Sequence, residues 1–198
     1  MARTLEFYFD YGSPYSYLAD TQVEAIAKRT GAALARKPML LGGVFKATGN
    51  ASPMTVALKS KWSAFDMPMW AHHYGVPFNR NPHFPVNTLT LMRGAAAAQI
   101  DGLFERYHPA MYKAMWVDGR NLNDIKEVAA VLTAAGLDAQ KFGQRIQDQD
   151  VKDRLKATTD NAVERGVFGA PTMFVDDMMF FGNDRLPFVE MALKGELK

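Results

Sequence analysis

The segment around Ser13 combines residue types that could bind and activate an anion. It reads YFDYGSPYSYL, in which an apolar stretch ends at Asp10 and a Ser-Pro pair follows shortly after. Serine is a preferred N-cap and proline a preferred first helical residue, so the pair predicts a helix that begins at Pro14. Free backbone N–H groups at a helix start attract negative charge, and the Ser13 hydroxyl adds a further donor. The segment therefore suits an anion such as a thiolate, although helix capping alone also accounts for it.

The composition decides where such a thiolate would come from. The 198 residues include no cysteine, which excludes disulfides, thiolate metal sites and a cysteine nucleophile. Any thiol chemistry near Ser13 therefore needs a thiol that is brought in as a ligand. His72 and His73 are adjacent and point apart on a helix, and no other histidine completes a zinc-binding spacing, so we expect no metal site.

Charge and hydropathy argue against two further classes of partner. The net charge is +2, from 23 basic and 21 acidic residues, which is too balanced for a nucleic-acid-binding protein. No apolar run approaches the roughly 20 residues that cross a bilayer, and MARTLEFYFD lacks the features of a secretory signal. We therefore expect a cytoplasmic protein. Its densest basic groups, LARKP and LKSKW, are typical of a solvated face, with contact to an anion as the alternative.

The elements that must position Ser13 form a strand, a helix and a second strand. Alternating apolar residues over 4–9 predict the first strand, and apolar spacings of three and four predict a helix from Pro14 that ends at Gly31. Residues 32–41 have the pattern of a second strand, which Pro38 interrupts. A connection of this length predicts parallel strands and a right-handed crossover.

Helical periodicity then dominates the middle of the chain. It runs from residue 42 to about residue 166 and contains the Pro-rich stretch VPFNRNPHFPVN. Asn87 or Thr88 is expected to cap a helix through MRGAAAAQI, and Asn123 is expected to cap the helix DIKEVAAVLTAAG. We interpret this block as a helical insertion.

The order of elements predicts an α/β fold built from two parts. APTMFV and MMFF flank the acids at 176–177 and predict an antiparallel hairpin, and a last helix begins near Asp184. The sum is βαβ, a helical block, then ββα. We expect one domain from residues 1–41 and 167–198, and an all-helical insertion domain from residues 42–166.

Four motifs in this order resemble a known family over nearly the whole chain. They are FYFDYGSPYSYLA, KATGN, VFGAPTMFV and FGNDRL. The layout resembles the thioredoxin fold with an inserted helical domain, as in disulfide-forming proteins that carry Cys-x-x-Cys at the first helix. Here that place reads Ser13-Pro14-Tyr15-Ser16, which resembles the cysteine-free branch: kappa-class glutathione transferases and bacterial 2-hydroxychromene-2-carboxylate isomerases. FGNDRL is closer to the isomerases, since the transferases more often have serine at the position of Asn183.

The resemblance implies a binding site for glutathione. Ser13 matches the serine that faces the glutathione sulfur, and Asn50 matches an asparagine near the tripeptide backbone. A cis peptide bond is expected before Pro171, which would leave the Ala170 N–H and C=O free to pair with an extended peptide. Asp184 is equally explained as an N-cap, and Asn50 as a turn residue. The implied cofactor-binding residues are Ser13, Asn50, Ala170, Pro171, Asn183, Asp184 and Arg185.

The resemblance also implies the reaction. Ser13 would stabilise a glutathione thiolate that adds transiently to the conjugated double bond of a ring-opened aromatic substrate, which allows cis-trans isomerisation before the thiolate leaves. Direct nucleophilic attack by Ser13 is the less favoured role. Two alternatives remain at this point: a kappa-class transferase that conjugates glutathione to electrophiles, and a glutathione-binding protein without turnover. Relatives suggest a homodimer.

Several further residues are candidates for substrate contact, each with an ordinary structural explanation. Lys46 is a candidate carboxylate partner, although a solvated lysine explains it as well, and Asn87 is a candidate ring contact or a helix cap. Asp10 is either a buried acid beneath the site or the end of a strand. A flat apolar pocket, or simply the core, would contain Trp62, Phe65, Met67, Trp70, Phe84 and Trp116.

Overall fold

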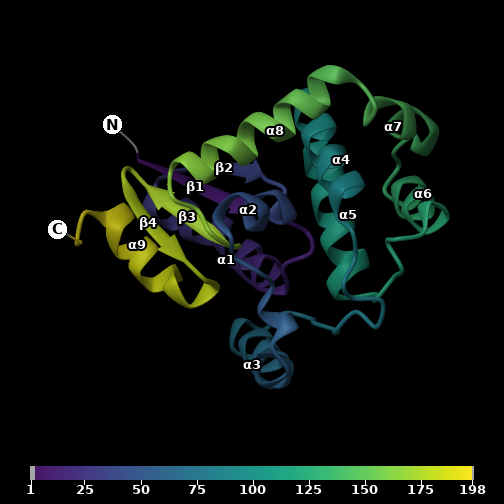
Figure 1. The fold of residues 1–198 in the computed structure, drawn as a ribbon. Helices are drawn as coiled ribbons and strands as arrows, with labels where there is room; N and C mark the ends of the chain where they lie inside the picture. Colours follow the sequence, from purple (N-terminus) through teal and green to yellow (C-terminus); the bar gives the residue numbers. More distant parts are fainter. Residues whose placement is uncertain (1–2, 198) are drawn as a thin grey trace.

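A four-stranded mixed sheet forms the centre of the molecule (Figure 1). The structure is a computed structural model and describes residues 3–197. The strand order is β2-β1-β3-β4, with β1 parallel to β2 and antiparallel to β3, and β3 antiparallel to β4. The strands are β1 (Thr4–Phe9), β2 (Ala33–Pro38), β3 (Thr172–Val175) and β4 (Met178–Phe181).

Helices make up most of the rest of the described chain. Those from α2 to α8 lie between β2 and β3 in the sequence, so a helical block separates the two halves of the sheet. None of the helices in residues 3–197 combines the length and the apolar character needed to span a membrane. The helices are α1 (Pro14–Thr30), α2 (Leu41–Thr48), η1 (Pro53–Thr55), α3 (Ala57–Tyr74), α4 (Leu89–Ile100), α5 (Phe104–Trp116), α6 (Ile125–Ala134), α7 (Ala139–Arg145), α8 (Gln149–Glu164), η2 (Asn183–Arg185) and α9 (Leu186–Lys194).

The predicted fold class is confirmed, because the strand-helix-strand start, the helical middle and the hairpin-helix end are all present. One predicted cap was wrong. The Asp124 carboxylate, not Asn123, accepts the Lys126 N–H and caps α6. The Asn123 side chain instead accepts the Asn87 N–H, because α4 and α6 begin close together. Asn87 accepts the Leu89 N–H at the start of α4.

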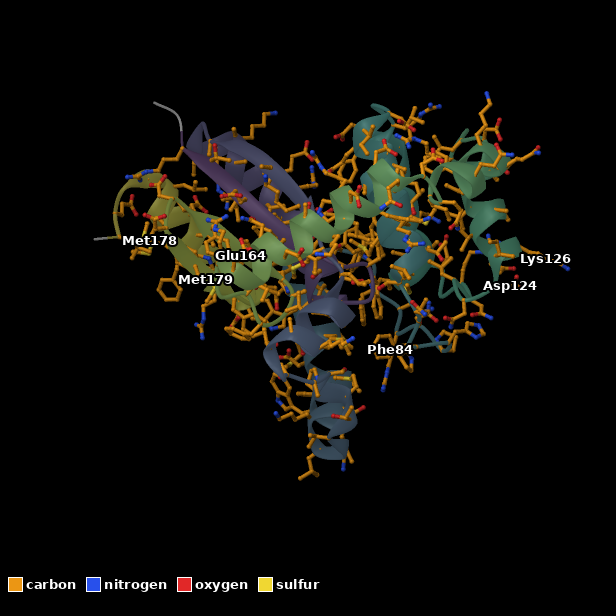
Figure 2. All side chains as sticks on the ribbon, turned by 45° about the horizontal axis from the view of Figure 1, so that its top comes forward. Phe84, Asp124, Lys126, Glu164, Met178 and Met179 are labelled. Atoms are coloured by element: carbon orange, nitrogen blue, oxygen red, sulfur yellow. The ribbon has the colours of Figure 1, made fainter. Side chains whose placement is uncertain are left out.

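The two faces of the sheet are covered by different helices. Leu5, Phe7 and Phe9 alternate onto one face and pack in a core with residues of α1, α5 and α9. On the other face, Tyr8 packs in a smaller cluster with residues of α2 and α8. The helical block continues to one side, with α6 at its outer end; Asp124 and Lys126 mark that end in Figure 2, far from Met178 and Met179 on β4.

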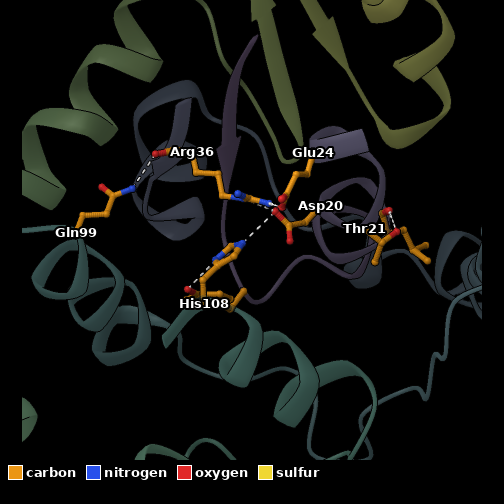
Figure 3. Close-up of polar contacts among 8 residues, drawn as sticks. Asp20, Thr21, Glu24, Arg36, Gln99 and His108 are labelled. Atoms are coloured by element: carbon orange, nitrogen blue, oxygen red, sulfur yellow. Dashed lines mark hydrogen bonds and ion pairs between the residues drawn. The ribbon is translucent and has the colours of Figure 1, made fainter. Parts of the chain in front are cut away.

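A buried polar cluster ties α1 to the edge strand and to the helical block (Figure 3). Asp20 of α1 accepts one hydrogen bond from Arg36 of β2 and contacts the His108 ring of α5, each at 2.9 Å. The other ring nitrogen of His108 lies 3.1 Å from the Tyr11 hydroxyl. Burial alone would raise the pKa of Asp20, but the His108 and Arg36 partners outweigh burial and lower it. The cluster therefore fixes the helix that carries Ser13.

Candidate active site

A cavity of about 770 Å³ opens where the start of α1 meets α3 and the segments that precede β3 and follow β4. The candidate residues named from the sequence divide into two groups around this cavity. Lys46, Asn87 and Arg185 lie outside its lining, and Lys46 and Asn87 are exposed. The cavity brings together Ser13, Asn50, Ala170, Pro171, Asn183, Asp184 and Trp62.

Ser13 caps α1 and also faces the cavity. Its Oγ accepts the Ser16 N–H at 3.1 Å, and Pro14 occupies the first helical position, as the sequence predicted. The first turn of α1 carries no acidic residue, so its N–H groups are not neutralised by a nearby carboxylate. Ser13 is only 5% exposed. Its hydroxyl therefore lies at a fixed point beside the positively polarised start of α1.

The segment before β3 lies directly opposite Ser13. The Ala170–Pro171 peptide bond is cis, as expected. The Ala170 C=O is not free, however, because it accepts the Ser13 hydroxyl at 3.0 Å. The Ala170 N–H makes no hydrogen bond within residues 3–197. One of the two backbone groups that the sequence suggested for peptide pairing is thus engaged by Ser13.

Asn50 connects two segments of the cavity wall. Its amide nitrogen donates to the Phe168 C=O at 2.8 Å, and its amide oxygen accepts the Ala51 N–H at 2.8 Å. Gly49 before it adopts the left-handed conformation that ends α2. Asn50 therefore fixes the loop after α2 against the loop that leads to Ala170.

The turn after β4 contributes a carboxylate. Asn183 is buried, and its backbone C=O accepts the Tyr74 hydroxyl at 3.1 Å, which holds the turn against α3. Asp184 lines the cavity and is about half exposed. Arg185 pairs loosely with Asp184 at 3.6 Å and lies over the Phe188 ring outside the cavity. The acid of this pair thus belongs to the site, and its neighbouring arginine points elsewhere.

Four charged or polar residues of the lining were not identified from the sequence. Lys59 and Arg80 line the cavity and form no ion pair within residues 3–197. The Tyr15 hydroxyl donates to the buried Asp66 carboxylate at 2.8 Å, and burial together with this bond raises the pKa of Tyr15. LKSKW, with its alternative of an anion contact, was the only signal for Lys59; nothing in the sequence places Arg80 in the same cavity as Ser13.

Aromatic rings make up much of the cavity lining. Trp62, Trp70, Phe84 and Trp116 all line it, and Met67 does so as well. The Phe84 and Trp116 ring centroids are 5.8 Å apart. Phe65 is the exception among the predicted pocket residues, because it is 67% exposed and faces away. The lining of the cavity therefore combines the Ser13 hydroxyl with several aromatic rings.

Asp10 is fully buried directly after β1 and beneath the cavity lining, so it is both a buried acid and a strand-end residue. Its carboxylate accepts the N–H groups of Gly12 and Leu41, each at 2.8 Å, and the Thr88 hydroxyl at 3.1 Å. Burial raises the pKa of Asp10, and these three donors oppose the rise. Since Gly12 and Leu41 line the cavity, Asp10 holds its floor in place.

The sequence and the structure were compared with known proteins. A family model described as the DSBA-like thioredoxin domain matches residues 4–194. This chain belongs to that family. It is 34% identical to a 2-hydroxychromene-2-carboxylate isomerase of Sphingobium xenophagum over 98% of this chain and 99% of the relative. It is 27% identical to the human glutathione S-transferase kappa 1 over 98% and 92% of the two chains.

A solved structure of a 2-hydroxychromene-2-carboxylate isomerase agrees with the fold. It superposes with a TM-score of 0.86 at 30% sequence identity, and the match covers 96% of this chain and 94% of that one. The family resemblance that the four sequence motifs indicated is therefore confirmed, and the chain groups with the isomerases and the kappa-class transferases.

Proposed function

We propose that this protein is a glutathione-dependent isomerase that converts 2-hydroxychromene-2-carboxylate, or a related intermediate of aromatic degradation, to trans-o-hydroxybenzylidenepyruvate. The observation that carries the proposal is the Ser13 hydroxyl at the start of α1, against the Ala170 C=O, in a cavity that several aromatic rings also line. The relatives named as isomerases at 31–34% identity over nearly the full chain support this reading. The cytoplasm, where glutathione buffers thiols, is the expected place of action.

The polar groups of the cavity lining match the functional groups of glutathione. Asp184 would accept its ammonium group, and the unpaired Lys59 would bind a carboxylate. The Ala170 N–H would donate to a peptide carbonyl, as in strand addition, while Asn50 holds the adjoining wall. A volume of about 770 Å³ lies within the range of small-molecule sites and leaves room for a second ligand.

Ser13 and the start of α1 would lower the pKa of the bound thiol. When bound, glutathione supplies a thiolate nucleophile, which the chain itself lacks because it has no cysteine. The Ser13 hydroxyl would turn from the Ala170 C=O to donate to the sulfur, while its Oγ still accepts the Ser16 N–H. A helix start and one hydroxyl together are sufficient for a reduction of about two pKa units, roughly 2.7 kcal/mol.

The aromatic rings of the lining would hold the substrate. Trp62, Trp70 and Phe84 offer flat surfaces to an aryl ring, and Arg80, which lines the same cavity, would bind the substrate carboxylate. The backbone around Arg80 is held in place: the Asn79 N–H donates to the Trp116 C=O, and buried Asn81 donates to two carbonyls near the end of α5. An arginine on such an anchored loop is preorganised for an anion.

The proposal is tested by the amount of glutathione that turnover requires. Chromene carboxylate is mixed with enzyme and far less glutathione than substrate, and isomerisation is followed by absorbance and by the free-thiol content. We expect complete conversion with no loss of glutathione, and a loss of about 30- to 100-fold in kcat/KM for Ser13→Ala. Conversion without glutathione, or full activity of Ser13→Ala, would contradict the proposal.

A kappa-class transferase is the second candidate, because four transferase relatives at 24–27% identity cover 96–99% of the chain. The same experiment separates the two activities. A transferase would consume one glutathione for each product molecule and would accept simple electrophiles. A non-catalytic binding protein would show glutathione affinity with neither activity.

A further inference from the structure

Asp66 is a buried acid in the cavity that the thiolate chemistry above does not use. It is only 7% exposed, and it forms no ion pair within residues 3–197. Its Oδ2 accepts the Tyr15 hydroxyl at 2.8 Å. Its Oδ1 accepts no hydrogen bond from residues 3–197, and this oxygen is not fully enclosed by protein. Because Asp66 lines the cavity, Oδ1 is available to a ligand there.

One face of α3 places Asp66 beside an aromatic surface. The residues at spacings of four, three and four along this face all line the cavity: Lys59, Ser63, Asp66 and Trp70. Side chains at such spacings are neighbours on a helix, with Cβ atoms about 5–6 Å apart. An aryl ring that packs on Trp70 therefore has its substituents within reach of Asp66.

The described residues that line the cavity include two carboxylates and no histidine. One carboxylate, Asp184, is about half exposed and is the proposed acceptor for the glutathione ammonium group. Lys59 and Arg80 are hydrogen-bond donors. Tyr15 keeps its proton, because burial and the bond to Asp66 both raise its pKa. Asp66 is thus the lining group suited to take a proton from a bound substrate.

The proposed reaction contains a step that needs such a group. 2-Hydroxychromene-2-carboxylate is a cyclic hemiketal, and its double bond can change from cis to trans only after the ring has opened. On opening, the bond between C2 and the ring oxygen breaks, and its electron pair stays on that oxygen. The C2 hydroxyl loses its proton as the C2=O bond forms. One proton must therefore move from the C2 hydroxyl to the phenolate oxygen, and no oxidant or reductant takes part.

We propose that Asp66 is the catalytic residue for ring opening, where it accepts the proton of the C2 hydroxyl and returns it to the phenolate oxygen. This inference rests on the proposed isomerase function and adds a step that precedes thiolate addition. Tyr15 is a positioning residue, because its hydroxyl fixes one carboxylate oxygen and leaves the other to the substrate. Ser13 takes no part in this step. Ring opening and isomerisation are therefore served by different residues of one cavity.

Two substrate analogues separate these steps. 2-Hydroxychroman-2-carboxylate has no double bond beside its hemiketal, so it opens and closes but cannot isomerise. NMR exchange spectroscopy without glutathione measures the rate at which its closed and open forms interconvert. cis-Benzylidenepyruvate has no ring hydroxyl, so it isomerises but cannot close. Absorbance in the presence of glutathione measures its conversion to the trans isomer.

Asp66→Asn keeps the size of the side chain and removes its capacity to carry the proton. We expect this variant to lose the acceleration of chroman ring exchange and about 100-fold in kcat/KM on the chromene. Its rate on cis-benzylidenepyruvate should stay within about twofold of the unmodified chain. Ser13→Ala should show the reverse pattern, with ring exchange intact and isomerisation of cis-benzylidenepyruvate lost. Urea unfolding and the calorimetric affinity for glutathione check that Asp66→Asn keeps its fold and its glutathione site.

Tyr15→Phe is a second variant that removes a single hydroxyl. Without the bond that holds Asp66, ring exchange and kcat/KM on the chromene should fall by about tenfold, with no change on cis-benzylidenepyruvate. Tyr112→Phe is the matched control. Tyr112 is buried outside the cavity lining, and its hydroxyl has no hydrogen-bond partner within residues 3–197, so all three rates should be unchanged.

Equal losses of Asp66→Asn on the chromene and on cis-benzylidenepyruvate would overturn the proposal, since Asp66 would then serve the fold or the thiolate step. Chroman exchange that the unmodified chain does not accelerate, or that Asp66→Asn accelerates as well, would also overturn it. Failure of the proposed isomerase function looks different. The unmodified chain would then leave cis-benzylidenepyruvate unchanged with glutathione, while chroman exchange and its dependence on Asp66 would persist.

Discussion

Ser13 has two roles that share one oxygen atom. Its Oγ accepts the Ser16 N–H, which fixes the position of the atom, and its single proton goes to the Ala170 C=O. A bound anion competes only for that proton, since the bond from Ser16 is unchanged by rotation of the hydroxyl. The helix cap therefore keeps the donor in place while its direction changes, and capping and anion binding are compatible at this residue.

Gly182 is the residue on which the position of Asp184 depends. Its φ is 100°, which side-chain-bearing residues rarely adopt, and a Cβ there would collide with the Asp184 carboxylate. Gly182→Ala should therefore displace the carboxylate and weaken glutathione binding by about tenfold or more, equivalent to about 1.4 kcal/mol. Isothermal titration calorimetry measures this affinity.

Gly42→Ala is the matched control for that substitution. Gly42 lies in α2, where a Cβ meets nothing within 4 Å, and alanine favours a helix by about 0.5–1 kcal/mol. This variant should bind glutathione as the unmodified chain does. If the two alanine variants bound equally well, Asp184 would not belong to the glutathione site.

At the scale of elements, α1 is held by charge as well as by packing. Asp20 lies between Arg36 of β2 and His108 of α5, with a side chain that is 15% exposed. These contacts connect the sheet to the helical block through the second turn of α1. The orientation of α1, and with it the position of Ser13, thus depends on a cluster outside the cavity.

Asp20→Asn should destabilise the protein in a manner that depends on pH. The pKa of Asp20 is lowered in the folded protein, so its contribution is present above the unfolded value near 3.9 and is lost as pH falls below it. At neutral pH the free energy of unfolding of the variant should be about 3 kcal/mol lower than that of the unmodified chain. The reason is that Arg36 and His108 would stay largely buried without the carboxylate that pairs with them. Below about pH 4, the free energy of unfolding of the variant should change less with pH than that of the unmodified chain.

Urea unfolding at a series of pH values measures both effects. Glu24→Gln is the control, because Glu24 also contacts Arg36, at 3.4 Å, but is 77% exposed and should contribute less than about 1 kcal/mol. Equal losses of unfolding free energy in Asp20→Asn and Glu24→Gln would show that the buried position of Asp20 adds nothing to stability.

The elements themselves were predictable because their signals are local. Ser13-Pro14 marked the start of α1, and the acids at 176–177 marked the hairpin, where Asp176 has a φ of 55°. The cap of α6 was misassigned because Asn123 and Asp124 have equal local propensity. Asn123 is diverted by the Asn87 N–H, a contact across the chain that no local pattern encodes.

At the scale of the whole molecule, the site forms only where distant segments meet. Ser13 contacts Ala170, Asn50 contacts Phe168, and Tyr74 contacts Asn183. The family motifs contained both partners of the first two pairs and Asn183 of the third, since those residues follow short sequence patterns. Lys59 and Arg80 were not located, because their approach to the cavity depends on how α3 and the Pro-rich loop pack, which is a long-range property.

The absence of cysteine from the whole chain gives the central claim a direct test. Every thiolate in a complex with glutathione must come from the ligand, so ultraviolet absorbance of the thiolate during a pH titration reports the pKa of the bound thiol alone. Ser16→Ala is the matched control for Ser13→Ala. Ser16 lies in the same turn of α1, and its hydroxyl has no hydrogen-bond partner within residues 3–197.

We expect the bound thiol to have a pKa of about 6.5 in the unmodified chain and in Ser16→Ala, against about 8.5 for a free thiol. In Ser13→Ala the value should rise by about one unit or more, because the hydroxyl donor is lost while the helix start remains. The same pKa in Ser13→Ala and Ser16→Ala, or a pKa near 8.5 in the unmodified chain, would contradict the assignment of Ser13 as the group that stabilises the thiolate.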